Sequence, residues 1–160
     1  MRPRKELYQV ICTKLAALIT NGTLKYVDLN KGQLDNPAQG YPISFPAVLI
    51  SIDRGLYSHK VENRVDGDVE VSLVVAYDDY HDTFIGAIGK AASEALLDRL
   101  DTIIETLTYT RGDNFTDLHL ASETFLPYTF KGLHAHRITF TTKTIHKLKN
   151  NAKLLITSGA

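Results

Sequence analysis

A short apolar run, set between two prolines and a glycine, constrains this fold more than any other stretch. Pro42 and Pro46 come before the run at residues 47–50, and Gly55 follows it. Proline has no N–H to donate to a β-ladder, so it lies at the start of a strand or on an edge. The run is apolar at both alternating positions, which is typical of a strand covered on both faces. We therefore expect a strand over residues 47–52, and one candidate cover for one of its faces is another copy of the protein.

Hydrophobic periodicity predicts a helix at the start of the chain and a group of strands after it. Residues 4–19 carry apolar side chains at helical spacing, and Asn21-Gly22 is a helix-ending pair. Apolar and polar residues alternate over residues 69–77, which is the clearest strand signal in the chain. Further strands are expected over residues 24–29, 118–125 and 136–144, with a long loop over residues 30–41 and a polar connection over residues 53–68.

A second, longer helix is expected over residues 82–107. Asp82 carries a side chain that is favoured at the N-cap position. The first half of this helix is rich in Gly and Ala, including Gly86 and Gly89, so another backbone can approach it closely.

The order of these elements predicts an α+β fold. Strands grouped in runs favour a mixed, mainly antiparallel sheet of about five strands, with two main helices packed on one face, in the order α-β-β-β-α-β-β. The 160 residues, 44% of them apolar, suit one domain over residues 1–145 and a basic, then apolar C-terminal arm over residues 146–160. The single Cys12 excludes an internal disulfide.

The formal net charge of zero conceals a segregation of charge along the chain. Residues 1–61 carry eight Lys/Arg against four Asp/Glu, a net charge of +4. Residues 62–123 carry four against fourteen, a net charge of −10, and residues 124–160 carry six against none, a net charge of +6. Two interpretations stay open. Copies can associate head to tail, acidic face to basic face, or the faces are simply solvated by different signs.

Some residues suggest chemistry, and each also has a structural explanation. Asp78, Asp79 and His81 can hold a divalent metal, but the same stretch is a natural turn from strand to helix. His134 and His136 lie on one side of an extended segment, as a pair of metal ligands or as surface histidines in a basic strand. Residues 111–113 spell an adhesion tripeptide but are more simply a turn. The sequence shows no nucleophile elbow and no phosphate-binding glycine motif, so we expect no catalytic residue and no cofactor.

In its order and in several stretches the chain resembles the tail terminator, or tail-completion, proteins of tailed bacteriophages. The amphipathic first helix is followed by "LKYVDLNKGQLDN" and "FPAVLISI". After these come "VEVSLVVAYDDYHD", "LDTIIETL" and "HRITFTTKT", and together the stretches span nearly all of residues 4–144. The chain departs from the family pattern in the long loop at 30–41 and in the extension after Thr144. These departures leave open a terminator position or a neighbouring connector position.

The resemblance implies a structural protein of the virion and not an enzyme. Such proteins form a ring, usually of about six copies, that caps the tail tube and joins it to the head–tail connector. The implied partners are further copies of the chain, the tail tube protein, the connector proteins and DNA, which passes through the lumen without sequence-specific binding. No membrane partner is expected. The implied location is the tail or neck of the virion, and the host cytoplasm during assembly.

Two sets of charged residues are the candidate sites of such a ring. The acidic residues of the middle segment are candidates for the lumen, because like charge keeps passing DNA from adhering to the wall. They are Asp66, Asp68, Glu70, Asp78 and Asp79. The basic residues of the last strand and tail are candidates for contacts between subunits, and they are Arg137, Lys143, Lys147, Lys149 and Lys153. The alternatives are a small metal-dependent enzyme or a ligand-binding domain that uses Asp78, Asp79 and His81.

Overall fold

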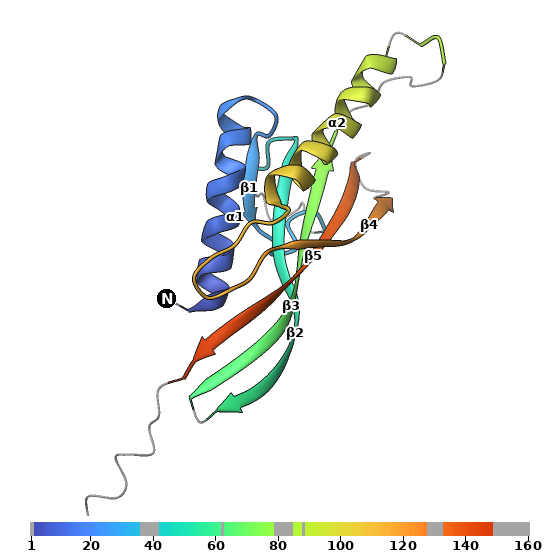
Figure 1. Cartoon of the computed structure of the whole chain (residues 1–160). Coiled ribbons are helices and arrows are strands. Elements are labelled where there is room, and N and C mark those ends of the chain that lie inside the picture. The colour runs from blue at the N-terminus through green and yellow to red at the C-terminus, as the bar shows by residue number, and fades with distance from the viewer. Residues whose placement is uncertain are drawn as a thin grey trace, which may run out of the picture.

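The fold is α+β, as the sequence predicts, with two helices and a five-stranded mixed sheet (Figure 1). The computed structural model describes residues 2–35, 42–61, 63–78, 85–87, 89–127 and 133–148. The elements are α1 (Pro3–Thr20), β1 (Tyr26–Leu29), β2 (Ala47–Val61), β3 (Arg64–Tyr77), α2 (Lys90–Leu107), β4 (His119–Pro127) and β5 (His134–Lys147).

The strands lie in the order β1-β2-β3-β5-β4. β1 runs parallel to β2, and all other neighbours are antiparallel. The four residues of β1 pair only with residues 47–50 of β2, so the two ladders that join β2, β3 and β5 form most of the sheet. Both edges of the sheet are therefore unlike its centre, because β1 is short and β4 is exposed along almost its whole length.

Both helices pack on the same face of the sheet. α1 begins with Pro3 in its first turn, and it ends at Asn21 and Gly22, where Gly22 takes a left-handed φ of 84° that suits glycine. The buried side chains of the two helices meet alternate residues of β2, β3 and β5 in one core. This core includes Leu7, Ile11 and Leu15 of α1, Leu100, Ile103 and Leu107 of α2, and Val48, Ile50, Val71, Leu73, Ile138 and Phe140 of the sheet.

The apolar run that opens β2 is covered on both faces, as expected. Ala47, Val48, Leu49 and Ile50 are at most 1% exposed. Val48 and Ile50 face the helices, while Leu49 packs on the other side with Leu34 and Phe45. The described chain therefore covers both faces of this run itself, and the second face does not need another copy of the protein.

The polar connection predicted over residues 53–68 is wrong. β2 and β3 continue through it as a long hairpin that closes with the pair Val61–Arg64. A β-ladder is held by backbone hydrogen bonds and does not need apolar side chains, so the outer part of this hairpin lacks the hydrophobic pattern of a strand. Register shifts between Ile52 and Arg54 and between His59 and Val61 add the irregularity that obscured the alternation.

α2 begins later than the sequence predicts. The expected start at Asp82 lies outside the described residues, and the helix itself runs from Lys90, with Gly89 at its N-cap. Gly86 lies in a turn with a φ of 94°, not within the helix. The predicted end at Leu107 is confirmed. The first turns of α2 extend beyond the end of the sheet (Figure 1).

Candidate functional site

The face of the sheet turned away from the helices carries most of the predicted charged residues. In β3, Val69 and Val71 face the helix core, so the alternating Asp66, Asp68 and Glu70 project from the opposite face. Their cross-strand neighbours project from it too. We call this surface the open face, and its charged residues are Arg54 and Lys60 of β2, Arg64, Asp66, Asp68 and Glu70 of β3, and Arg137, Lys143 and Lys147 of β5.

The structure brings the two predicted sets of residues together. Asp68 of the predicted lumen set pairs across the sheet with Lys143 of the predicted inter-subunit set. Lys147 pairs with Arg64, two residues from Asp66. The two sets are therefore interleaved on one surface. Asp78 is exposed just after β3 ends, and Asp79, Lys149 and Lys153 lie outside the described residues.

The open face is mixed in charge, with six basic and three acidic side chains in the set above. Arg64 donates to both oxygens of Asp66, from Nε at 2.8 Å and from Nη2 at 3.2 Å. This hydrogen bond is the main reason why the pKa of Asp66 is lowered, and the positive charges of Lys60 and Lys143 add to the effect. The same contact raises the pKa of Arg64. The acids of β3 are thus partly neutralised by basic neighbours. The distribution of charge along the sequence does not show this, because two of those neighbours, Lys60 and Lys143, come from other segments of the chain.

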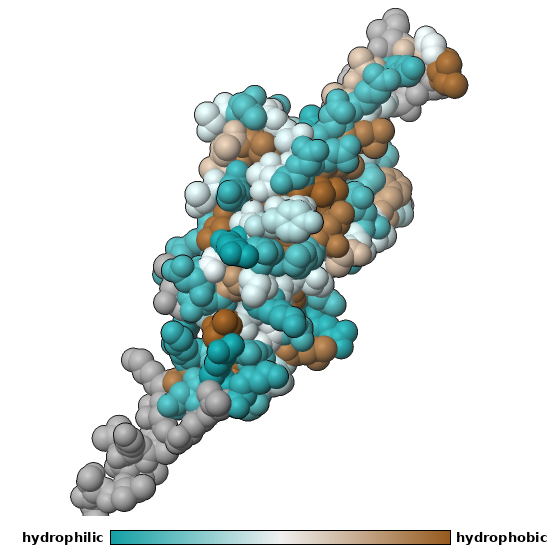
Figure 2. Space-filling view, viewed as in Figure 1, coloured by the Kyte–Doolittle hydropathy of each residue, from teal (hydrophilic) through white to brown (hydrophobic). Residues whose placement is uncertain are grey.

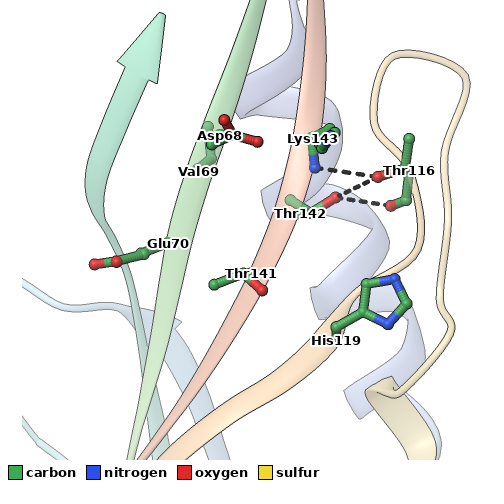
Figure 3. Close-up of a pocket in the computed structure, with 8 residues that line it drawn as sticks. All are labelled: Asp68, Val69, Glu70, Thr116, His119, Thr141, Thr142 and Lys143. Carbon is green, nitrogen blue, oxygen red and sulfur yellow. Dashed lines mark hydrogen bonds between the residues drawn. The ribbon is translucent and has the colours of Figure 1, made fainter.

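Two adjoining hollows lie on this surface. The larger, of about 270 Å³, is lined by residues of β3, β5 and the start of β4 (Figure 3). The smaller, of about 190 Å³, continues toward the hairpin end, and both share Asp68, Thr116 and Lys143. Figure 3 shows Asp68 directed toward β5 and Glu70 directed away from it. These are open depressions lined in part by charged side chains.

Thr116 fixes one side of the hollows by attaching the segment before β4 to β5. Its N–H donates to the carbonyl oxygen of Lys143 at 2.8 Å, and the Lys143 N–H donates to Thr116 Oγ1 at 3.1 Å. The buried Thr142 hydroxyl donates to the carbonyl oxygen of Thr116 at 2.8 Å. The backbone of Lys143 is therefore held by hydrogen bonds to Thr116 on one side and by the pairing with β3 on the other.

A buried carboxylate, which the sequence did not single out, anchors the same loop. Glu6 of α1 is 7% exposed, and its Oε1 accepts from the N–H groups of Asp113 at 2.5 Å and Asn114 at 3.4 Å. Its Oε2 accepts from Asn114 Nδ2 at 2.5 Å. Burial raises the pKa of Glu6, but these hydrogen bonds outweigh burial and leave the pKa below 4.5. The available sequence signal was an acidic residue directly beside the buried stripe of an amphipathic helix.

The residues that suggested chemistry are placed as follows. His134 and His136 both stack on Tyr77, with ring centroids 5.7 Å and 6.0 Å away, and both also contact Phe125. Desolvation lowers the pKa of His136, which favours its neutral form. The predicted metal residue His81, like Asp79, lies outside the described residues.

Within the described ranges, no group of three or more His, Cys, Asp or Glu residues is arranged to hold a metal ion. The adhesion tripeptide lies in the loop between α2 and β4, where Arg111 pairs with Asp117 at 2.7 Å. No helix of this part of the chain is long and apolar enough to cross a membrane.

Comparison with known proteins finds similarity in structure but not in sequence. No protein-family model and no curated protein matches the chain. Among solved structures, 26 chains match. One of them belongs to a structure described as the virion of a native gene transfer agent particle, with a TM-score of 0.61 and 11% sequence identity. The match covers 89% of this chain and 96% of that chain, so the two share the fold over nearly their whole lengths.

Proposed function

We propose that this protein is a structural component of a phage-like virion, and that it forms a ring at the joint between tail and head. The observation that carries the proposal is the likeness, over 89% of this chain and 96% of the other, to a chain of a gene transfer agent virion. The likeness includes the whole domain, so it is not limited to a common helix–sheet fragment. The order of elements that resembled tail terminators points the same way.

The charge distribution supports head-to-tail association of copies. Head-to-tail interfaces close into a ring when the rotation between neighbours divides a full turn. α2 exposes acidic residues on the side opposite its buried residues, namely Glu94, Asp98, Asp101 and Glu105. α1, whose one acidic residue is buried, exposes Arg4, Lys5 and Lys14. Two surfaces of opposite sign, on different elements, favour such an interface.

In the proposed ring the open face turns toward the channel through which DNA passes, and the helices form the outside. Asp66, Asp68 and Glu70 then line the channel. Lys143 and Lys147 lie on the part of β5 that extends beyond its pairing with β4, and in the proposed ring they face the neighbouring copy. The sharing of one face by both sets is consistent with this arrangement. Arg64 is paired with Asp66 on this wall, and a paired cation contributes less to DNA binding than a free one. The tail tube protein and the connector proteins are the proposed partners at the two ends of the ring.

The test is the assembly state of the purified protein. Light scattering and negative-stain electron microscopy, over a range of concentrations, should show rings of about six copies, near 107 kDa for a chain of 17.8 kDa. Labelled protein should also bind to particles at the end of the tail near the head. A protein that remains a monomer at all concentrations and does not bind to particles would overturn the proposal.

A charge-neutralised variant tests the electrostatic part separately. Replacing Lys143 and Lys147 by Gln should weaken ring formation at physiological salt, and raised salt should weaken the parent ring in the same direction. Lys25→Gln, an exposed lysine away from the open face, is the matched control. An unchanged ring in the Lys143 and Lys147 variant would show that these lysines lie away from the subunit boundary.

A further inference from the structure

β4 is an edge strand with little of the usual protection against pairing with another strand. It has nine residues, and all of them except Leu126 are exposed. Within the described part of the chain, β4 pairs with β5 on one side and with no strand on the other. Monomeric proteins protect such edges with Lys, with interior Pro or by covering them. β4 has no Lys or Arg, its proline is the last residue, and its main irregularity is a register shift near Ala121.

Apolar side chains are exposed on and beside this edge. Phe125 is 50% exposed and Leu120 is 42% exposed. Figure 2 shows apolar surface in the region of α2 and β4. An unpaired strand edge with exposed large apolar groups is a site at which another strand adds to the sheet.

The other end of the sheet offers a second free edge of similar length. β1 covers β2 only at residues 47–50, so residues 51–60 of β2, which pair with β3 on their inner side, have no strand on their outer side in the described part of the chain. Within one sheet β4 runs antiparallel to β2, because each is related to β3 and β5 through antiparallel pairs. Sheets that continue from copy to copy around an axis keep these directions. β4 of one copy can therefore form an antiparallel ladder with β2 of the next.

Charge favours this pairing over a two-fold pairing of β4 with itself. Glu123 is the central residue of β4, so a symmetric antiparallel β4–β4 pair would place two glutamates opposite each other, which is destabilising. Residues 51–60 of β2 instead carry Arg54 and Lys60 against one acid, Asp53.

The positions of the two helices also favour the pairing of β4 with β2 of the next copy. In Figure 1, α1 lies on the β1 side of the sheet and α2 on the β4 side. Pairing β4 with the next copy's β2 brings the acidic outer side of α2 toward the neighbour's basic α1.

We propose that the copies join by strand addition, with β4 of one copy pairing with residues 51–60 of β2 in the next copy. This inference rests on the proposed ring but specifies its interface. The pairing is head to tail, so each copy uses both of its edges, and the sheets form a continuous wall with the open faces on one side.

The first experiment blocks the edge without disturbing the core. Ala121→Lys with Ser122→Lys places two charges at exposed positions of β4, where Ser122 pairs with the neutral Thr139 of β5 and Ala121 lies at the register shift. The variant should melt like the parent, but the protein concentration needed for ring formation should rise at least tenfold. Asn63→Lys with Ser44→Lys, also two added lysines at exposed positions, is the control and should assemble normally.

The second experiment identifies the paired segment. A photo-reactive residue in place of Thr124 should cross-link two copies, and mass spectrometry of mixed ¹⁴N and ¹⁵N protein should locate the bond in the tryptic peptide 55–60. Cross-links to β4 of another copy, or to residues 149–160, would overturn the inference while leaving a ring in place. Normal rings in the β4 lysine variant would do the same. A parent that forms no ring and does not bind to particles would overturn both the inference and the proposed function.

Discussion

Replacing Glu6 by Gln tests whether a single carboxylate holds the loop that supports the open face. The carboxylate bridges α1 and residues 113–114 through two hydrogen bonds of 2.5 Å and one of 3.4 Å. Gln has nearly the same shape but only one acceptor oxygen. Its NH₂ group faces either the N–H of Asp113, where donor meets donor, or the side chain of Asn114, whose amide must then turn to present its oxygen.

The expected cost can be worked out from these contacts. A hydrogen bond to a charged group contributes about 1.5–3 kcal/mol to stability, and the long bond contributes little. Gln keeps one acceptor and loses the charge, so we expect the free energy of unfolding to fall by about 2 kcal/mol. For a chain of this size that corresponds to a decrease of about 4–8 °C in melting temperature.

Thermal and urea unfolding followed by circular dichroism measure this loss. Glu94→Gln is the matched control. Glu94 is exposed, and its ion pair with Lys90 at 3.7 Å contributes at most about 0.5 kcal/mol to the free energy of unfolding. A Glu6→Gln protein that melts within about 1 °C of the parent would refute the reasoning, since it would show that the loop does not depend on the carboxylate.

The same carboxylate predicts a dependence on pH. Its folded-state pKa lies below 4.5, so the folded state favours the ionised form more than the unfolded state does. The stabilisation is fully present above the unfolded pKa and is lost as the pH falls through the folded pKa. The difference in stability between the parent and Glu6→Gln should therefore be largest above about pH 5 and should shrink as the solution is acidified below about pH 4. A difference that stays constant down to pH 3 would contradict this.

Three further substitutions address the same loop and its attachment. Gly112→Ala should destabilise the fold by about 1–3 kcal/mol in urea unfolding, because a Cβ there would collide with the ring of the buried Phe115. Thr142→Val should cost about 1 kcal/mol, because it removes the 2.8 Å bond to the carbonyl of Thr116, and hydrogen exchange near residue 116 should increase. Arg111→Ala should leave the melting temperature unchanged within error, because its ion pair is at the surface, and a clear decrease would mean that the loop depends on it.

The sequence predicted the parts of the fold that are determined by burial. The apolar stripe of α1, the alternation in β3 and the apolar start of β2 each record contact with the core, so the α+β class and the order of elements could be read from them. Asn21-Gly22 was equally informative, because a left-handed φ at the helix end has a specific residue preference.

The outer hairpin could not be read in this way. Residues 53–61 and 64–68 are strands because their backbones pair with each other and with β5, and most of their side chains are exposed. Hydrophobic patterning reports burial and is weak where most side chains of a ladder are exposed. The role of Glu6 was missed for a related reason, since its partners in the loop at 112–114 are more than 100 residues away in the chain.

The placement of the charges shows how segregation along a chain differs from segregation in space. The acidic middle segment divides between β3 and α2, which lie on opposite sides of the core. On β3 the ladder with β5 sets basic residues beside the acids, and on α2 the acids stay together on the outer side. In the proposed ring, charge complementarity between copies therefore depends more on α2 and α1 than on the β3 acids. The proposed strand pairing sets the register of that interface, because a ladder fixes position residue by residue while charges alone do not.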